Sequence, residues 1–528
     1  MPVSINQISG RLDESEKSII EKAVRAVGLK MNDVVKSGIN KVSLDARKRS
    51  NIHFVYSVYI EVGDKKTENK LLGNKQCRIV TDSNINPVFS DKQKSGEIVI
   101  AGFGPAGMFC GLVLAEYGYR PIILERGCDV DTRIKYVTDY WAGGRLNVNS
   151  NVQFGEGGAG TFSDGKLTTR INDPLCRYVL EKFYEFGAPE EILVKAKPHI
   201  GTDNLRKIVK SIRNRITELG GEVIFNSKLD DFVLKNNKIT SVIYNKFEQI
   251  DADAVVLAIG HSARDTFEML MNKQIFMQPK PFSVGVRIEH KQTAVNESLY
   301  GEYSGNPLLP VGEYQLSHRN SDGRGVYTFC MCPGGHVVPA ASEENTVVTN
   351  GMSNFSRDGE NANAAVVVSV SEKDYGNGVL DGVEFARMIE KNAYLTANGG
   401  QTAPATTVRG FLNGEPSLKT NIVSTYDRGL HKCDFDKIFP DFVTDMLKTG
   451  IASFSKKMKC FSDENALLTA PETRTSSPVR ITRNESMNSL SAENLYPCGE
   501  GAGYAGGIMS AAVDGVKTAL AIMSKFGR

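Results

Sequence analysis

The first residues with a recognisable chemical pattern form a G-x-G-x-x-G motif: Gly102, Gly104 and Gly107, with Pro105 and Ala106 inside it. An apolar run precedes the motif, and an apolar helix is predicted over 107–117. In such a unit the first glycine permits a tight turn, the second lets backbone approach a pyrophosphate, and the third allows close helix packing. The helix start attracts phosphate through its free N–H groups and its dipole. The spacing therefore predicts a dinucleotide site, for either NAD or FAD.

An acidic residue stands where such a site needs one. Glu125, followed by Arg126, ends the next predicted strand, 18 residues after Gly107. Its carboxylate can accept hydrogen bonds from ribose hydroxyls, and it would repel a 2′-phosphate. Glu125 and Arg126 are therefore assigned to the same dinucleotide site.

A second Gly-rich helix start lies near the C-terminus and favours FAD over NAD. It contains Gly499, Glu500, Gly506, Gly507 and Ile508. A simple NAD enzyme needs no such second support, whereas FAD is long and needs one at each end. Glu500 could hydrogen-bond ribityl hydroxyls. The helix opening at 506–508 could direct its positive end at the flavin N1–C2=O edge, which gains negative charge on reduction.

A third Gly-rich loop, residues 155–166, is dense enough in glycine for its backbone to touch a flat ligand. Gly157, Gly158 and Thr161 are assigned to the cofactor on this basis. Lys166, at the end of the loop, is a candidate contact of flavin or substrate, although most lysines are solvated.

The elements that must position these loops indicate an α/β fold. Strands are predicted at 222–226, 229–235, 239–244 and 254–259, and an amphipathic helix at 205–219. The predicted architecture is a Rossmann-type FAD-binding domain with an inserted mixed α+β substrate domain and a small N-terminal α+β module. Its boundaries are predicted as an N-terminal module and linker at 1–95, FAD-binding parts at 96–279 and 456–528, and the insertion at 280–455.

Within the N-terminal module, VSINQIS reads as a strand, 15–27 as a helix and the alternating run 52–62 as a half-buried strand. Polar residues 63–95 are expected to contain the connection to the main domain. The basic run at 36–50 is either a nucleic-acid patch or a solvated surface, and the second reading is favoured.

Several long motifs resemble a bacterial family of FAD-dependent dehydrogenases of uncertain substrate. They include IVIAGFGPAGMFCG, FGEGGAGTFSDGKL, AIGHSARDTFEML, YTFCMCPGG, ETRTSSPVRITR and PCGEGAGYAGGIMS. The resemblance covers roughly 97–525 and is more distant to the glutathione-reductase-type FAD superfamily. It implies that the first motif and Glu125 meet the ADP half of non-covalent FAD and the C-terminal loop the flavin half, with the loop 155–166 beside the isoalloxazine and Gly260 near the cofactor. The superfamily usually has Asp where this chain has Glu500.

Candidate groups for chemistry on a substrate are Arg287, His336, Arg474 and Arg480. Arginine suits a carboxylate through paired hydrogen bonds, and histidine moves protons near neutral pH. Cys330 and Cys332 could be a redox pair or part of a metal site, but two buried thiols are favoured, because a CxC strains a direct disulfide. We expect no metal site.

The expected function is an FAD-dependent oxidoreductase that moves hydride or electrons between flavin N5 and a small or lipid-like substrate. The alternatives are a flavoprotein that binds or modifies RNA through its N-terminal module, and a non-catalytic flavin-bound redox sensor. A second G-x-G-x-x-G with its own βαβ unit is absent from the sequence, so use of NAD(P)H stays open, as does the identity of any other electron donor or acceptor.

Composition narrows the partners and the compartment. A net charge of +2 in 528 residues gives no electrostatic reason to expect DNA and weighs against RNA. The longest apolar runs are too short to span a bilayer. Nine dispersed cysteines fit a reducing compartment, so we expect a cytoplasmic bacterial protein.

Overall fold

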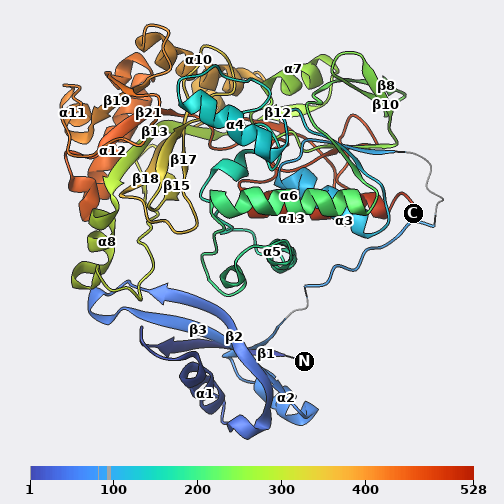
Figure 1. The fold of residues 1–528 in the computed structure, drawn as a ribbon, viewed down its shortest axis with the longest axis vertical. Helices are drawn as coiled ribbons and strands as arrows, with labels where there is room; N and C mark the ends of the chain where they lie inside the picture. The colour runs from blue at the N-terminus through green and yellow to red at the C-terminus, as the bar shows by residue number, and fades with distance from the viewer. Residues whose placement is uncertain (1, 81–82, 92–96, 528) are drawn as a thin grey trace.

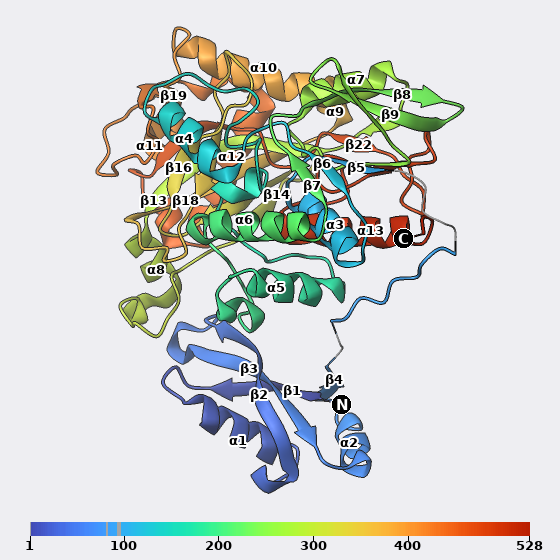
Figure 2. The ribbon, with the colours of Figure 1, turned by 45° about the vertical axis from the view of Figure 1, so that its right-hand side comes forward.

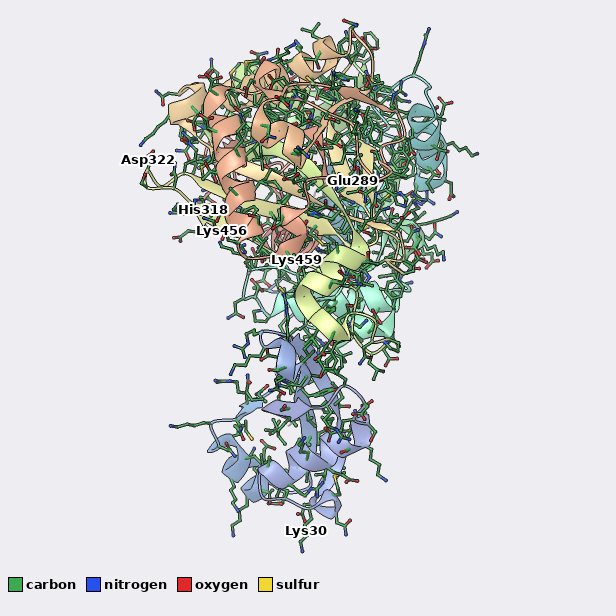
Figure 3. All side chains as sticks on the ribbon, turned by 90° about the vertical axis from the view of Figure 1, so that its left-hand side faces the viewer. Lys30, Glu289, His318, Asp322, Lys456 and Lys459 are labelled. Atoms are coloured by element: carbon green, nitrogen blue, oxygen red, sulfur yellow. The ribbon has the colours of Figure 1, made fainter. Side chains whose placement is uncertain are left out.

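The computed structural model describes residues 2–80, 83–91 and 97–527. They form a small N-terminal module and a large body, which lie one below the other in Figures 1 and 2. With the side chains drawn, Lys30 marks the end of the module farthest from the body, whereas Glu289 lies within the body (Figure 3).

The N-terminal module is an antiparallel sheet of strand order β2-β3-β1-β4 with two helices packed against it. Its elements are β1 (Val3–Gly10), α1 (Glu16–Ala26), β2 (Val34–Asp45), β3 (His53–Val62), α2 (Lys65–Leu72) and β4 (Cys77–Ile79). Ile19 of α1 and Leu71 of α2 share one buried cluster with Val58 and Ile60 of β3. The apolar residues of β3 alternate because every second residue faces the helices, as the sequence predicts.

The predicted strand VSINQIS, the helix at 15–27 and the strand at 52–62 are confirmed by β1, α1 and β3. The polar stretch 63–95 is more than a connection, because α2 and β4 lie inside it and complete the module. Short polar helices and three-residue strands carry little periodic signal. Residues 81–82 and 92–95 of this stretch lie outside the described residues.

The basic run of the module is a surface feature. Lys36, Lys41, Arg47 and Lys48 are exposed. The module touches the body beside this run: Val42 N–H donates to Val194 O at 2.8 Å, and Ala196 N–H donates to Val42 O at 2.8 Å. Arg49 Nη2 donates to Ser298 O at 2.5 Å. Part of the basic run therefore serves as a contact with the body.

The centre of the body is a five-stranded parallel sheet of order β23-β11-β5-β6-β7. The strands are β5 (Ile98–Ala101), β6 (Ile122–Leu124), β7 (Glu222–Ile224), β11 (Ala254–Leu257) and β23 (Leu495–Pro497). Pairing of β23 with β11 brings the C-terminal segment into the same sheet as the first G-x-G-x-x-G strand, although the two are far apart in sequence. This is the predicted Rossmann-type α/β arrangement.

Helices cover this sheet, among them α3 (Pro105–Glu116), α6 (Thr202–Glu218) and α13 (Ile508–Met523), which run alongside one another in Figure 1, with α5 (Leu175–Glu185) beyond them. α3 is apolar on every side because it lies between the sheet and other helices. A Cβ added to Gly515 of α13 would lie 2.2 Å from the carbonyl oxygen of Ala106. That glycine allows the starts of α3 and α13 to approach closely.

The inserted domain is built on a seven-stranded sheet of order β14-β15-β18-β13-β21-β19-β20. The strands are β13 (Phe282–Lys291), β14 (Ser317–Arg319), β15 (Gly325–Cys332), β18 (Asn361–Val370), β19 (Ala403–Thr407), β20 (Leu430–Lys432) and β21 (Leu467–Glu472). The helices α8 (Gln292–Tyr300), α10 (Asp381–Thr396), α11 (Val408–Asn413) and α12 (Asp441–Ser455) contribute residues to its core or pack against it. Because β21 pairs with β13 and β19, this sheet extends past residue 455, the end that the sequence predicts for the domain.

Smaller elements complete the body. They are α4 (Val130–Trp141), the three-stranded sheet β8 (Leu229–Lys235), β9 (Lys238–Tyr244) and β10 (Glu248–Asp251), α7 (Arg264–Asn272), the pair β12 (Met277–Pro279) and β22 (Val479–Ile481), the pair β16 (His336–Pro339) and β17 (Thr349–Met352), and α9 (Glu372–Tyr375). Within residues 2–80, 83–91 and 97–527, no helix combines the length and the apolar character needed to cross a bilayer.

Candidate functional site

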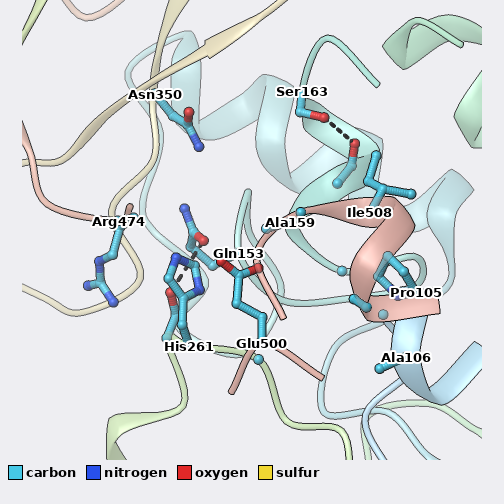
Figure 4. Close-up of a pocket in the computed structure, with 18 of the residues that line it drawn as sticks. Pro105, Ala106, Gln153, Ala159, Ser163, His261, Asn350, Arg474, Glu500 and Ile508 are labelled. Atoms are coloured by element: carbon cyan, nitrogen blue, oxygen red, sulfur yellow. Dashed lines mark hydrogen bonds between the residues drawn. The ribbon is translucent and has the colours of Figure 1, made fainter. Parts of the chain in front are cut away.

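A cavity of about 480 Å³ lies at the carboxyl ends of the parallel strands. Ala101, Leu124 and Ala258, at or just past the ends of β5, β6 and β11, form part of its lining. This edge is the usual ligand site of open α/β sheets. The inserted domain closes another side with residues 328–331 and Asn350. The cavity therefore lies between the parallel sheet and the insertion (Figure 4).

The first glycine loop has the geometry that its motif predicts. Gly102 has φ +101°, and a Cβ there would lie 2.4 Å from Ala258 O. A Cβ on Gly107 would lie 2.0 Å from Gly102 O, so this glycine serves packing and lies behind the cavity lining. At Gly104, the N-cap of α3, a Cβ would meet only Gly158 Cα, at 3.7 Å. The start of α3 therefore opens into the cavity.

The loop at 155–158 lies directly against the first glycine loop. Gly155, Gly157 and Gly158 all have positive φ, and a Cβ on Gly158 would lie 2.9 Å from Gly104 Cα. Gly158 lines the cavity, whereas Gly157 and Thr161 lie behind it, with a Cβ on Gly157 only 2.2 Å from Thr161 Oγ1. Gly157 and Thr161 are predicted from the sequence to contact the ligand, but they pack against each other behind the lining and stabilise the loop.

Glu125 joins these two loops. One carboxylate oxygen accepts a hydrogen bond from Phe103 N–H at 2.8 Å, and the other accepts from Gly127 N–H at 2.9 Å and Gly155 N–H at 3.0 Å. Glu125 lines the cavity, and these three hydrogen bonds leave one acceptor site, on Oε2, for a ligand. Arg126 also lines the cavity, pairs with Asp265 at 3.1 Å and lies over the ring of Phe154.

Arg133 of α4 is an important residue that the sequence analysis does not single out. It is fully buried, and its guanidinium donates hydrogen bonds to carbonyl oxygens along residues 151–158: Asn151, Val152, Gly155, Glu156 and Gly158. One side chain thus holds the whole loop. Nothing in its sequence context signals this, because the partners are backbone oxygens supplied by tertiary contact.

The C-terminal loop supplies the third part of this backbone surface. Gly506, Gly507 and Ile508 line the cavity at the start of α13, and a Cβ on either glycine would meet nothing within 4 Å. Gly499 lies behind the lining, where its N–H donates to Asp514 Oδ2 at 2.7 Å. We call residues 102–107, 155–160 and 499–508 the glycine cradle.

Glu500 is the acidic residue of the glycine cradle that lines the cavity. Burial raises the pKa of its carboxyl from 4.5 to about 7, against the opposing effects of the Gly507 N–H and of Lys280. In the view of Figure 4, Glu500 lies between Pro105 and Ala106 on one side and His261 and Arg474 on the other. A carboxyl group therefore points into the cavity between its two ends.

Side chains, mostly from the insertion, form the opposite side of the cavity, and we call Lys166, Glu313, Cys330, Asn350 and Arg474 the polar wall. Lys166 Nζ lies 3.3 Å from Glu313 and also donates to Met331 O, and Lys197 Nζ lies 2.7 Å from Glu313. Burial works against ionisation of Glu313, but Lys166 and Lys197 lower its pKa to about 2. Lys166, a candidate contact of flavin or substrate from its position in the sequence, thus lies in the cavity lining.

Arg474 is the one predicted catalytic residue that lies in the cavity lining. Its Nη2 donates to Glu390 Oε2 at 3.2 Å, while its buried Nε has no hydrogen-bond partner among the described residues. Burial lowers the pKa of His261, beside it, to about 4, and the charge of Arg474 acts in the same direction. A neutral imidazole and a cationic group with an unused donor therefore lie together.

The other predicted catalytic residues lie elsewhere. Arg287 is fully buried and pairs with Glu472 at 2.7 Å, with further hydrogen bonds to Asn363 and Cys330 O. This corrects the prediction that Arg287 clamps a substrate, because its donors are occupied inside the sheet. His336 is exposed on β16, and Arg480 lies over the ring of Tyr504; neither is part of the cavity lining.

Comparisons with known proteins now bear on this cavity. Residues 281–475 match the family described as "FAD-dependent protein, C-terminal domain-like", and residues 1–61 match a domain of unknown function, DUF8436. An uncharacterized protein of Clostridium beijerinckii is 46% identical over 533 residues, covering 100% of this chain and 99% of its own. The chain belongs to its family. The domain matched at residues 281–475 indicates that this chain is an FAD-dependent protein.

Solved structures are only distantly similar to this FAD-dependent protein. Glycine oxidase from Bacillus cereus is 10% identical with a TM-score of 0.35, over 80% of this chain and 94% of its own. Glycerol-3-phosphate dehydrogenase from Bacillus halodurans, solved with FAD, is 12% identical with a TM-score of 0.34, over 82% of this chain and 65% of its own. These values are too low to support a conclusion about this chain.

The lining of the cavity gives an independent reason to expect FAD in this protein. Gly260, Gly506 and Gly507 line it, and a Cβ on any of them would project where no protein atom lies within 4 Å. The starts of α3 and α13 both open into it without a side-chain cap. Backbone surfaces of this kind accept a long, flat ligand that carries phosphate.

Proposed function

We propose that the protein is an oxidoreductase that uses FAD to move hydride or electrons to or from a small anionic molecule bound at the polar wall. When bound, FAD supplies two-electron chemistry at N5. The observation that carries the proposal is that one cavity contains both the glycine cradle and the polar wall. A substrate at the wall would therefore lie in the same enclosed space as the cofactor.

In this proposal the two halves of FAD lie on different parts of the glycine cradle. Gly102, Gly104, Pro105, Ala106 and the start of α3 hold the pyrophosphate, with Glu125 and Arg126 toward the adenosine ribose. Gly158, Glu500, Gly506, Gly507 and Ile508 hold the ribityl chain and the flavin. The open space in front of Gly104 and Gly507 supports this division.

The polar wall would select and orient the substrate. The unpartnered Nε of Arg474 and the ammonium of Lys166 support an anionic group, because a buried donor gains most from a charged acceptor. His261 is held neutral because burial and the charge of Arg474 lower its pKa, so it would meet the substrate as an uncharged hydrogen-bonding group. Arg474, Lys166 and Lys197 outnumber the one carboxylate of Glu313, so the charge of this side of the cavity is compatible with a small carboxylate.

The conditions of action are also part of the proposal. All nine cysteines are free thiols, which supports a reducing compartment such as the bacterial cytoplasm. NAD(P)H would reach the flavin only transiently, because the sequence shows no second G-x-G-x-x-G motif with its own βαβ unit.

The test is anaerobic reduction of the purified yellow protein by fractions of a metabolite extract, followed by flavin absorbance. Heat-released cofactor is identified first by chromatography. We expect FAD, and bleaching by a fraction of small anions. Recovery of FMN alone would contradict the assignment of the cradle. Turnover would be contradicted if the protein held FAD at full occupancy but no fraction reduced the oxidised protein and no fraction oxidised the reduced protein.

A further inference from the structure

Two of the nine free cysteines lie together at the polar wall. Cys330 lines the cavity and is half-buried, while Cys332 is fully buried directly behind it. The Cys332 thiol donates a hydrogen bond to the backbone carbonyl oxygen of Cys330 at 3.3 Å. Of the nine cysteines, all within the described residues, Cys330 alone belongs to the cavity lining.

An irregularity of β15 creates this arrangement. The pairing of β15 with β18 shifts register between Phe329 and Cys332, and Cys330 has φ +43°, a backbone conformation that residues other than glycine rarely adopt. A bulge of this kind redirects side chains and is common beside active sites. Here the bulge leaves Cys330 in the cavity lining, while Cys332, two residues along the same strand, is fully buried.

Charged neighbours favour the thiolate form of the exposed partner. Arg287 Nη1 donates to Cys330 O at 3.2 Å, and Lys166 donates to the next carbonyl, that of Met331. The hydrogen bond from Cys332, together with the charges of Arg287 and Lys166, lowers the pKa of Cys330, whereas the pKa of Cys332 is raised. This is the pattern of an attacking and a resolving thiol. It also gives Arg287, rejected above as a substrate clamp, a positioning role.

We propose that Cys330 and Cys332 form a dithiol–disulfide pair that exchanges two electrons with FAD in the same cavity. On oxidation of the pair, the Cys332 S–H bond would break, one S–S bond would form with the Cys330 thiolate, and two electrons and one proton would pass to FAD. The reverse step would reopen the disulfide with two electrons and one proton from reduced FAD. A disulfide in so short a ring is readily reduced, which suits a transient carrier rather than a structural crosslink.

This inference rests on the proposed function, because it needs FAD in the cavity. The first experiment counts electrons. Oxidised holoenzyme is titrated anaerobically with dithionite, and we expect about two equivalents per bound FAD in the unaltered protein, but about one in Cys330→Ser and Cys332→Ser. Cys176→Ser, which changes a partly exposed thiol on α5 outside the cavity lining, is the matched control and keeps about two.

A second experiment needs neither a variant nor bound FAD. The apoprotein is equilibrated in dithiothreitol buffers of graded oxidation, alkylated, digested with trypsin and analysed by mass spectrometry. We expect the peptide that contains both Cys330 and Cys332 to convert from doubly alkylated to internally crosslinked, while the Cys176 peptide stays alkylated. If Cys332→Ser fails to fold, the electron count in Cys330→Ala and the alkylation of the unaltered apoprotein still test the dithiol pair.

The outcomes separate the two proposals. Failure to bind FAD would overturn the proposed function. Normal FAD content with about one electron-pair equivalent in the unaltered protein, or a peptide that stays alkylated at every buffer composition, would overturn the dithiol pair alone. Loss of the extra equivalent in Cys330→Ser and Cys332→Ser with retention in Cys176→Ser supports it.

Discussion

The glycine cradle and the polar wall face each other across one cavity, yet they are made of different groups. The cradle presents backbone and is stabilised from behind by Glu125 and Arg133, whose hydrogen bonds go to main-chain atoms. The wall presents side chains, and its charges belong to ion pairs such as Lys166 with Glu313. A backbone surface can be recognised by its glycines, whereas a side-chain surface depends on which segments the fold brings together.

This contrast implies that changes in the cradle should remove FAD, while changes in the wall should leave FAD bound and alter only what reacts with it. Four predictions test the contrast.

The largest effect is expected for Gly104→Val. The new side chain would fill the space at the start of α3, displacing phosphate from charge-assisted hydrogen bonds worth about 1.5–3 kcal/mol each, so FAD affinity should fall by about 100-fold or more. Equilibrium dialysis of the apoprotein with FAD measures this. The control Gly305→Val adds the same side chain at an exposed glycine of the insertion. Equal affinity in both variants would show that the loop is only a packing turn.

Arg133→Met should come next. It leaves the carbonyl oxygens of Asn151 and Val152 without a donor and takes one donor from three others in the loop. Unsatisfied buried groups cost about 1–3 kcal/mol each, so the free energy of unfolding should fall by about 3 kcal/mol or more. FAD should be lost at the same time. Urea unfolding followed by circular dichroism measures the change, with exposed Arg47→Met as the control. A variant that is less stable but binds FAD normally would mean that the loop is not part of the cradle.

Glu500→Gln should change the pH dependence of the apoprotein. Because the folded pKa of Glu500 is raised to about 7 from 4.5, the folded state keeps a proton that the unfolded chain has released, and stability is lost as pH rises across this interval. The loss is at most about 3 kcal/mol for this group. Unfolding free energies of parent and variant should therefore differ progressively between pH 4.5 and 7.5, in favour of the variant at high pH. Parallel curves would place the carboxyl in solvent.

The smallest effect is expected at the wall. Arg474→Gln should leave FAD content unchanged but slow flavin reduction by the active metabolite fraction about 10-fold, or about 1.4 kcal/mol, through loss of an anion contact. Stopped-flow absorbance measures the rate. Arg480→Gln removes an arginine outside the cavity lining and should have little effect. Loss of FAD in Arg474→Gln would erase the distinction between the cradle and the wall.

Local sequence was sufficient for the elements and for most of the cradle. Gly102 could be assigned because it takes the positive φ of the turn, and Gly107 because it packs on Gly102 O within the same strand–turn–helix unit. Gly506 and Gly507 could be assigned because they open a helix. The alternation in β3 and the periodicity of α6 were likewise visible, since burial on one face leaves a periodic pattern. Short elements such as α2 and β4 leave none.

Tertiary structure alone decided which polar residues face the cavity. Arg287 and Arg474 are both arginines in recognisable motifs. Arg287 on β13 pairs with Glu472 on β21, which occupies its donors, whereas the Nε of Arg474 has no hydrogen-bond partner among the described residues. Arg133 and the bulge that turns Cys330 toward the cavity depend on contacts with distant segments. The sequence could thus predict a dinucleotide site and the glycines that form its backbone support, because a turn and a helix start are local features. The fold decided which side chains face the cavity, because those contacts are not local.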